Sequence, residues 1–248
     1  MIILVSNDDG IHSEGVLALE EVLQRLGNVY TVAPDREQNS MSHALTLHRP
    51  LRVQEVGPRR FAVDGTPTDC VKLALGLLPE RPRLVVSGIN KGPNLGDDII
   101  YSGTVSAAIE GTLMNIPSIA VSLVTFRDFV FNAAAEFTVT LASRILEKGL
   151  PPGTLLNVNV PPVPKHKLKG WRLTRQGKRH YSEEIVERVD PRGKKYYWIG
   201  GDDLGFAKEE GTDCVAVDEG FISVTPLQID LTNHRVFQEI QLLTFPWP

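Results

Sequence analysis

Residues 1–15, MIILVSNDDGIHSEG, join an apolar run to an acidic turn. The run 2–5 is unbroken and contains β-branched residues, a pattern typical of a strand covered on both faces, as in a parallel sheet. Asp8 and Asp9 follow directly, so two adjacent carboxylates are expected at the carboxyl end of a core strand. Their like charges repel, which disfavours ionisation of both unless a cation lies nearby.

The chain up to residue 160 continues this strand with alternating helix and strand patterns. A helix is expected over 15–26, and another begins at the capping residues Thr66, Pro67 and Asp69. The other predicted elements are strands over 29–34, 84–90, 117–124 and 155–160, and helices over 102–115 and 133–149. This alternation predicts an α/β fold with a Rossmann-like, mainly parallel, doubly wound sheet.

The pattern changes after residue 160. The segments EEIVERV (183–189), DPRG (190–193) and KKYYWIG (194–200) predict a β-hairpin. Because the second strand is rich in aromatic residues, we favour an arm that projects and contacts another subunit over a hairpin folded back on its own core. We therefore divide one fold unit into an α/β core over 1–160 and a C-terminal extension with the hairpin over 161–248.

Composition excludes several function classes. The 26 basic and 30 acidic residues give a net charge of −4, which argues against a nucleic-acid partner, because binding a phosphate backbone needs clustered basic residues. No apolar run approaches the roughly 20 residues of a membrane span. Two cysteines without metal-ligand spacing and a first strand that starts at Met1 predict a reduced, cytoplasmic protein without a signal peptide.

Three loops should meet at the carboxyl edge of the predicted sheet: 7–10, 35–40 and 87–96. Each mixes side-chain oxygens with small residues, and divalent cations such as Mg²⁺ prefer oxygen ligands. A cation there would offset the repulsion between Asp8 and Asp9. The alternative is that these two residues cap the helix that follows, although one aspartate suffices for a cap.

A fourth element, Ser102, Gly103 and Thr104, opens a predicted helix whose free N–H groups could bind an anion. Plain helix capping is the alternative. A cation site and an anion site at one sheet edge together indicate phosphate chemistry. His43, near the second loop, is a candidate proton donor, with a structural role as its alternative.

Several blocks carry a family resemblance: ILVSNDDGIHSEG, VAPDREQNSMSHALTLHRPLR, GTPTDCVKLAL, VVSGINKGPNLGDDIIYSGTVSAAIEG and GTDCVAVDEGFISVTPLQIDLT. In this order they span most of the chain and resemble the SurE survival-protein family. The resemblance implies a divalent-metal-dependent phosphomonoesterase, a 5′-nucleotidase that hydrolyses nucleoside 5′- and 3′-monophosphates and also short polyphosphate. It further implies one Mg²⁺, Mn²⁺ or Co²⁺ ion per subunit, and a C-terminal region that swaps between subunits in homodimers or homotetramers.

Carried over residue by residue, the resemblance assigns metal binding to Asp8, Asp9 and Asn90. The family's fourth ligand is typically a serine, and Asn39 stands at that position. An amide oxygen can replace a hydroxyl as a donor, with Ser40 beside it as the other option. Phosphate contacts are implied for Asn94, Ser102, Gly103 and Thr104. Asp8 and Asp9 are also the catalytic candidates, in support of a metal-activated water or by direct attack on phosphorus.

Two other functions fit an acidic pair after a first strand. A phospho-accepting receiver module binds Mg²⁺ there, but it needs an aspartate at the tip of its third strand, where this chain has SGIN (87–90). A metal-dependent N-acetyl-sugar deacetylase uses a His-Pro-Asp-Asp strand end, whereas this chain has Ser-Asn-Asp-Asp. In each case, this chain lacks a residue that the alternative chemistry needs.

Overall fold

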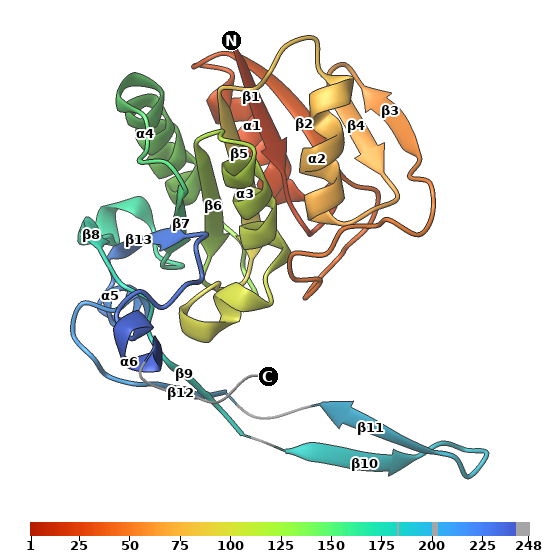
Figure 1. Cartoon of the computed structure of the whole chain (residues 1–248), viewed down its shortest axis with the longest axis vertical. Helices are drawn as coiled ribbons and strands as arrows, with labels where there is room; N and C mark the ends of the chain where they lie inside the picture. The colour runs from red at the N-terminus through yellow and green to blue at the C-terminus, as the bar shows by residue number, and fades with distance from the viewer. Residues whose placement is uncertain (183, 200–202, 242–248) are drawn as a thin grey trace.

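The computed structural model describes residues 1–182, 184–199 and 203–241, and within them helices cover both faces of a nine-stranded sheet (Figure 1). The strand order is β3-β4-β2-β1-β5-β6-β7-β13-β8. These strands are β1 (Ile2–Ser6), β2 (Asn28–Pro34), β3 (Val53–Gly57), β4 (Arg60–Val63), β5 (Leu84–Lys91), β6 (Ser118–Leu123), β7 (Thr154–Val160), β8 (Trp171–Leu173) and β13 (Ile222–Gln228). The strands predicted from apolar runs are therefore present at the expected positions.

The strands from β4 to β7 in this order are all parallel to their neighbours. Two antiparallel pairs flank this block, because β3 runs against β4 and β13 runs against β7. The predicted α/β, mainly parallel, doubly wound sheet is confirmed. The carboxyl ends of β1, β2, β5 and β6 consequently lie at one edge of the sheet.

Four long helices form the outer layers. Helices α1 (Glu14–Leu23) and α4 (Asn132–Lys148) pack on one face of the sheet, and α2 (Pro67–Leu77) and α3 (Gly103–Leu113) pack on the other. The predicted capping box of α2 is present, since Thr66 and Asp69 bond to each other's backbone N–H. At the start of α1, Gly15 permits close contact with β5, because a Cβ there would collide with the carbonyl oxygen of Ile89.

The chain after residue 160 contributes to the central sheet, because β8 and β13 lie in it next to β7. The remaining elements are η1 (Gly96–Ile100), η2 (Lys165–Lys167), β9 (Arg179–Tyr181), β10 (Ile185–Val189), β11 (Lys195–Ile199), β12 (Asp203–Phe206), α5 (Asp213–Asp218) and α6 (Phe237–Gln241). The division at residue 160 stays a prediction. No helix of the described part is long and apolar enough to cross a membrane.

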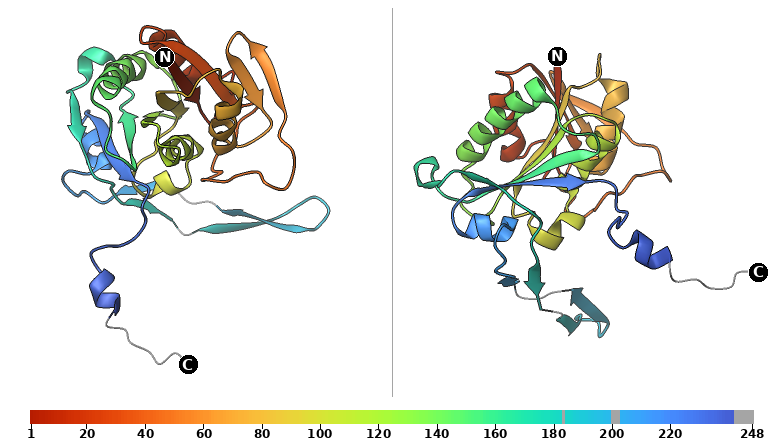
Figure 2. Two further views of the ribbon diagram at one scale, coloured as in Figure 1. Left: turned by 45° about the horizontal axis from the view of Figure 1, so that its top comes forward. Right: turned by 60° about the vertical axis from the view of Figure 1, so that its left-hand side comes forward.

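Strands β10 and β11 pair antiparallel and form the predicted hairpin, with Ile185 opposite Ile199. Figures 1 and 2 show this hairpin standing off the body of the protein. Glu183 and Gly200, the outer ends of the predicted hairpin, lie outside the described residues, as does the stretch 242–248 of the C-terminal extension.

Candidate active site

A cavity of about 830 Å³ lies where the loops after β1, β2 and β5 meet the first turn of α3. Of the residues predicted for the site, Asp8, Asn39, Ser40, Asn90, Asn94 and Ser102 line it. Asp9 lines a neighbouring cavity of about 600 Å³, which shares Asn39, Lys91 and Phe126 with the first. Loops far apart in the sequence meet here because the parallel strands end at one edge.

Asp8 is buried and is held by the start of α3. One carboxylate oxygen accepts the N–H of Thr104 at 3.0 Å, and the other accepts the Thr104 hydroxyl. The helix that follows Asp8 is capped by Ser13, whose side chain accepts the N–H of Val16 at 3.4 Å. The idea that Asp8 and Asp9 cap this next helix is therefore wrong. Asp8 is bonded to a helix 95 residues later in the sequence, with its side chain fixed at the cavity wall.

The electrostatics of this pair favour a bound cation. Burial raises the pKa of Asp8, and burial together with the charge of Asp8 raises the pKa of Asp9 to about 6. One Asp9 oxygen accepts the N–H of Lys91 at 3.3 Å, which offsets only part of this destabilisation. A buried and a half-buried carboxylate that resist joint ionisation fit a site whose charge balance needs a divalent ion.

The other oxygen donors of the site are amides. In the described part of the chain, no three His, Cys, Asp or Glu side chains gather as a metal cluster, so a cation at Asp8 and Asp9 needs different ligands. The side-chain nitrogen of Asn90 donates to the carbonyl of Gly92 at 3.0 Å, and that of Asn39 donates to Glu37. In both residues the remaining amide oxygen is suited to a hard cation.

At the start of α3, some of the donors that an anion would need are already bonded to other residues. Ser102 is the N-cap and its side chain accepts the N–H of Val105 at 3.0 Å, so the capping alternative is correct for this residue. Thr104 gives both its N–H and its hydroxyl to Asp8. Thr104 therefore positions Asp8, and its contact with phosphate stays a prediction. Gly103 packs directly on Asp8, since a Cβ there would stand 2.8 Å from that of Asp8.

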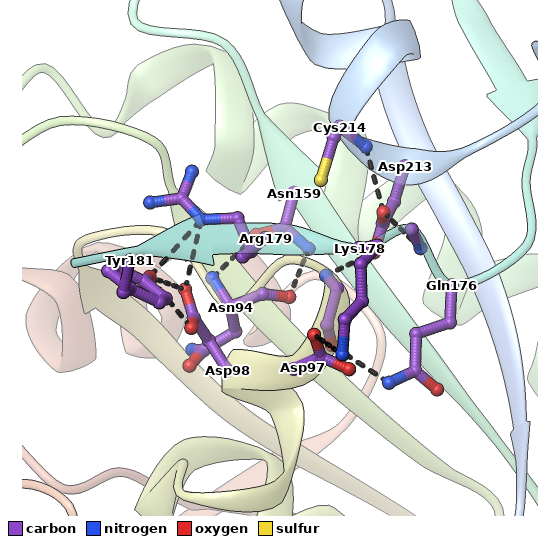
Figure 3. A network of polar contacts seen from close by, with 12 residues as sticks. Asn94, Asp97, Asp98, Asn159, Gln176, Lys178, Arg179, Tyr181, Asp213 and Cys214 are labelled. Atoms are coloured by element: carbon purple, nitrogen blue, oxygen red, sulfur yellow. Dashed lines mark hydrogen bonds and ion pairs between the residues drawn. The ribbon is translucent and has the colours of Figure 1, made fainter. Parts of the chain in front are cut away.

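Asn94 is held from both sides by buried amides (Figure 3). Its backbone N–H donates to the side-chain oxygen of Asn159 at 2.9 Å, while its carbonyl accepts from Asn159 at 3.0 Å and from Asn157 at 2.8 Å. Its own side-chain nitrogen donates to Ser122 at 2.7 Å. The two supporting asparagines lie on β7, and sequence reasoning did not identify them as site residues.

The C-terminal extension forms one wall of the cavity. Asp213 is fully buried and accepts three backbone N–H groups, including that of Gly96 at 2.9 Å. The Tyr181 hydroxyl donates to both carboxylate oxygens of Asp98 at 2.7 and 2.8 Å, and Arg179 lies 3.5 Å from the same carboxylate (Figure 3). Arg179 and Tyr181 both line the 830 Å³ cavity. These contacts hold strand β9 against η1, next to Asn94.

His43, the candidate proton donor, does not join the other predicted residues. Its ring nitrogen lies 3.0 Å from the buried carboxylate of Glu110, which also lies 3.0 Å from Lys72. His43 lines a separate cavity of about 720 Å³. The structure therefore supports the structural alternative for His43, because its imidazole already serves as the partner of a buried acid.

Lys91, Phe126, Arg179 and Tyr181 also line the larger cavity. Sequence reasoning placed the loop of Lys91 at this edge without giving it a role, and it missed the other three. Phe126 had a usable signal, because it follows the predicted strand 117–124 and must lie at the same sheet edge as the other loops. Arg179 and Tyr181 had none, since nothing in the local pattern of β9 indicates that it returns to this edge.

Comparison with known proteins gives a consistent result. Residues 3–183 match the family described as Survival protein SurE. The chain is 57% identical to 5′-nucleotidase SurE of Geobacter sulfurreducens over 243 residues, which is 97% of this chain and 93% of that protein. It is 56% identical to 5′-nucleotidase SurE of Syntrophotalea carbinolica, with 96% and 95% covered. The crystal structure of the SurE protein from Aquifex aeolicus shares 46% identity at a TM-score of 0.88, with 98% and 99% covered.

Proposed function

Because the chain belongs to the SurE family, we propose that it is a 5′-nucleotidase, a metal-dependent phosphomonoesterase that hydrolyses nucleoside 5′-monophosphates to nucleoside and phosphate. The observation that carries this proposal is the pair of adjacent carboxylates, buried Asp8 and half-buried Asp9, beside amide oxygens where two cavities meet. The relatives lend no support to a receiver module or a deacetylase. Activity on 3′-monophosphates and short polyphosphate is part of the proposal.

We infer that Asp8, Asp9, Asn39 and Asn90 hold one divalent cation, Mg²⁺, Mn²⁺ or Co²⁺. When bound, the ion supplies positive charge that stabilises the charge developing on the phosphoryl oxygens. Carboxylate and amide oxygens are the donors that such hard cations prefer, and the raised pKa of Asp9 shows how poorly the site tolerates its own negative charge without one. Ser40, which also lines the cavity, is the alternative to Asn39.

The chain's own residues would orient the ester and the attacking water. We place the phosphoryl group against Asn94 and the Ser102–Gly103–Thr104 turn, with the Lys91 side chain at the border of both cavities. The carboxylate of Asp9 accepts a proton as a water oxygen bonds to phosphorus. The bond from phosphorus to the nucleoside oxygen then breaks, and that oxygen takes a proton from solvent.

A phosphate-release panel tests this function. Purified protein with Mn²⁺ is offered the 5′- and 3′-monophosphates of several nucleosides, acetyl phosphate and N-acetylglucosamine. We expect repeated turnover of the nucleoside monophosphates. Stable labelling by acetyl phosphate without turnover would instead indicate a receiver, and release of acetate from the sugar would indicate a deacetylase.

Removal of the Asn159 amide should weaken substrate binding. In Asn159→Ala, the Asn94 N–H loses its partner, and a buried donor without one costs about 1–3 kcal/mol. We expect kcat/KM for AMP to fall about 10-fold, mainly through KM, because small displacements of a positioning group reduce rates strongly. Asn157→Ser is the control, since it leaves the Asn94 carbonyl bonded to Asn159. Thermal unfolding separates misfolding from misplacement, and an unchanged KM in folded Asn159→Ala would contradict the role.

We propose that the β10–β11 hairpin contacts another copy of the chain in a dimer or tetramer. Its side chains are open to solvent: Ile199 is 95% exposed, Ile185 67% and Trp198 63%. Apolar groups this exposed are typical of an interface. Deletion of 184–200 should reduce the sedimentation coefficient, and an oligomer that stays intact would exclude the hairpin as the contact.

Neither a nucleic acid nor a membrane is proposed as a partner, and the cytoplasmic location remains a prediction.

A further inference from the structure

Phe126 stands where the two cavities of the site meet. It lines both the 830 Å³ cavity and the 600 Å³ cavity, together with Asn39 and Lys91. Its side chain is 78% exposed, although it lies in the loop that directly follows the buried strand β6. A large apolar ring left open beside a polar site is not explained by packing of the core.

The Phe126 ring lies against Gly92. Gly92 has a φ of +133°, and a Cβ at that residue would stand 3.1 Å from the Cε1 atom of Phe126. The loop around the ring is also closed on itself, because the Thr125 hydroxyl donates to the carbonyl of Arg127 at 2.6 Å and accepts its N–H at 3.2 Å. The ring is therefore placed before any ligand binds, against the loop that carries Asn90.

Two of the other aromatic rings at the two cavities are already engaged, and the third, Tyr101, lines only the larger cavity. Phe129 stacks on Phe131 with ring centroids 6.1 Å apart, and the Lys91 ammonium lies 5.1 Å from its centroid. Tyr181 has the Arg179 guanidinium 5.2 Å from its ring and gives its hydroxyl to Asp98. Phe126 differs from both because its ring is exposed and borders the two cavities at once.

We propose that Phe126 is the platform on which the base of the nucleotide stacks, an inference that rests on the proposed nucleotidase activity. With phosphate at Asn94 and α3, a ligand that fills the larger cavity reaches Phe126 at its border. Stacking on an aromatic ring accepts every base, because each base has a π-face. The platform therefore favours nucleotides over phosphate esters without a base, with little preference among bases.

The test compares AMP with ribose 5-phosphate, which carries the same phosphate ester without the base. Phe126→Ala should lower kcat/KM for AMP about 5- to 100-fold, mainly through KM, the range expected for loss of one stacked base. Its kcat/KM for ribose 5-phosphate should stay within about 2-fold, because the ester is bound by other residues. Phe126→Trp should retain the AMP preference, since the platform is kept.

Phe129→Ala is the matched control, three residues further along the same loop and also at the smaller cavity. Because its half-buried ring is engaged by Phe131 and Lys91, its loss should change kcat/KM for the two substrates by the same factor. Equal effects of Phe126→Ala on both substrates, or no effect on either, would overturn the platform. A wild-type protein that hydrolyses neither ester would instead refute the nucleotidase itself, so the two failures can be told apart.

Discussion

Asp9→Asn should lower kcat for AMP hydrolysis at least about 10²- to 10³-fold, the scale seen when a main charge-stabilising group of an active site is lost. Asparagine has nearly the same shape, so the change removes a negative charge and an anionic oxygen donor while the packing stays. Asp8→Asn should have an equal or larger effect, because it also disturbs the contact with the backbone and hydroxyl of Thr104. Steady-state phosphate release measures both variants.

These variants should remain folded, which is as informative as the loss of rate. The raised pKa values of both residues mean that their joint ionisation opposes folding of the metal-free protein. Thermal unfolding at pH 8 should therefore give Asp9→Asn the same midpoint as the parent chain or a higher one. Asp128→Asn, on the loop after β6 at the same edge, is the control, because its positive φ of 53° suits asparagine. Parent rates in both site variants would refute the site.

Chelation should reduce phosphate release to background, and Mg²⁺, Mn²⁺ or Co²⁺ should restore it. The affinity for the ion should also depend on pH in a defined direction. With the pKa of Asp9 raised to about 6, a proton occupies this carboxylate at lower pH and must leave before a cation binds. Mn²⁺ affinity should therefore fall about 10-fold for each pH unit below 6, for one displaced proton.

Linkage gives the matching sign for stability. The folded metal-free protein binds more protons than the unfolded chain between the unperturbed Asp pKa of 3.8 and the raised value of about 6. Its stability should fall as pH rises through this window, and saturating Mn²⁺ should abolish that trend, because the folded and unfolded states then both carry an ionised Asp9. Calorimetric titration with Mn²⁺ and thermal unfolding at pH 5, 6 and 7.5 test both. Activity that persists after exhaustive chelation, or affinity independent of pH, would contradict a cation at Asp9.

Much of the fold could be predicted because its signals are local. Unbroken apolar runs such as 2–5 and 84–86 give buried parallel strands, and the capping residues Thr66 and Asp69 set the start of a helix wherever the rest of the chain lies. Parallel strands then place the ends of β1, β2 and β5 at one edge. That argument brings together the loops that carry Asp8, Asn39, Asn90 and Asn94, and these four residues line one cavity.

The contacts that hold the site could not be predicted in this way. Thr104 bonds to Asp8 across 96 positions, and Asn159 bonds to Asn94 across 65. Such pairs depend on which helix covers which strand, and an asparagine in a buried strand carries no mark of its partner. The same reason explains His43, whose position in the chain suggested the active site although its partner is Glu110 in a different cavity.

The sheet, its alternating helices and the acidic strand end follow from local sequence patterns, because side-chain periodicity and capping act over a few residues. Only the tertiary structure decided that Thr104 engages Asp8, that β9 brings Arg179 and Tyr181 to the cavity, and that Phe126 stands open between two cavities. These arrangements follow from packing between distant segments, where geometry and burial select the partner and local pattern does not.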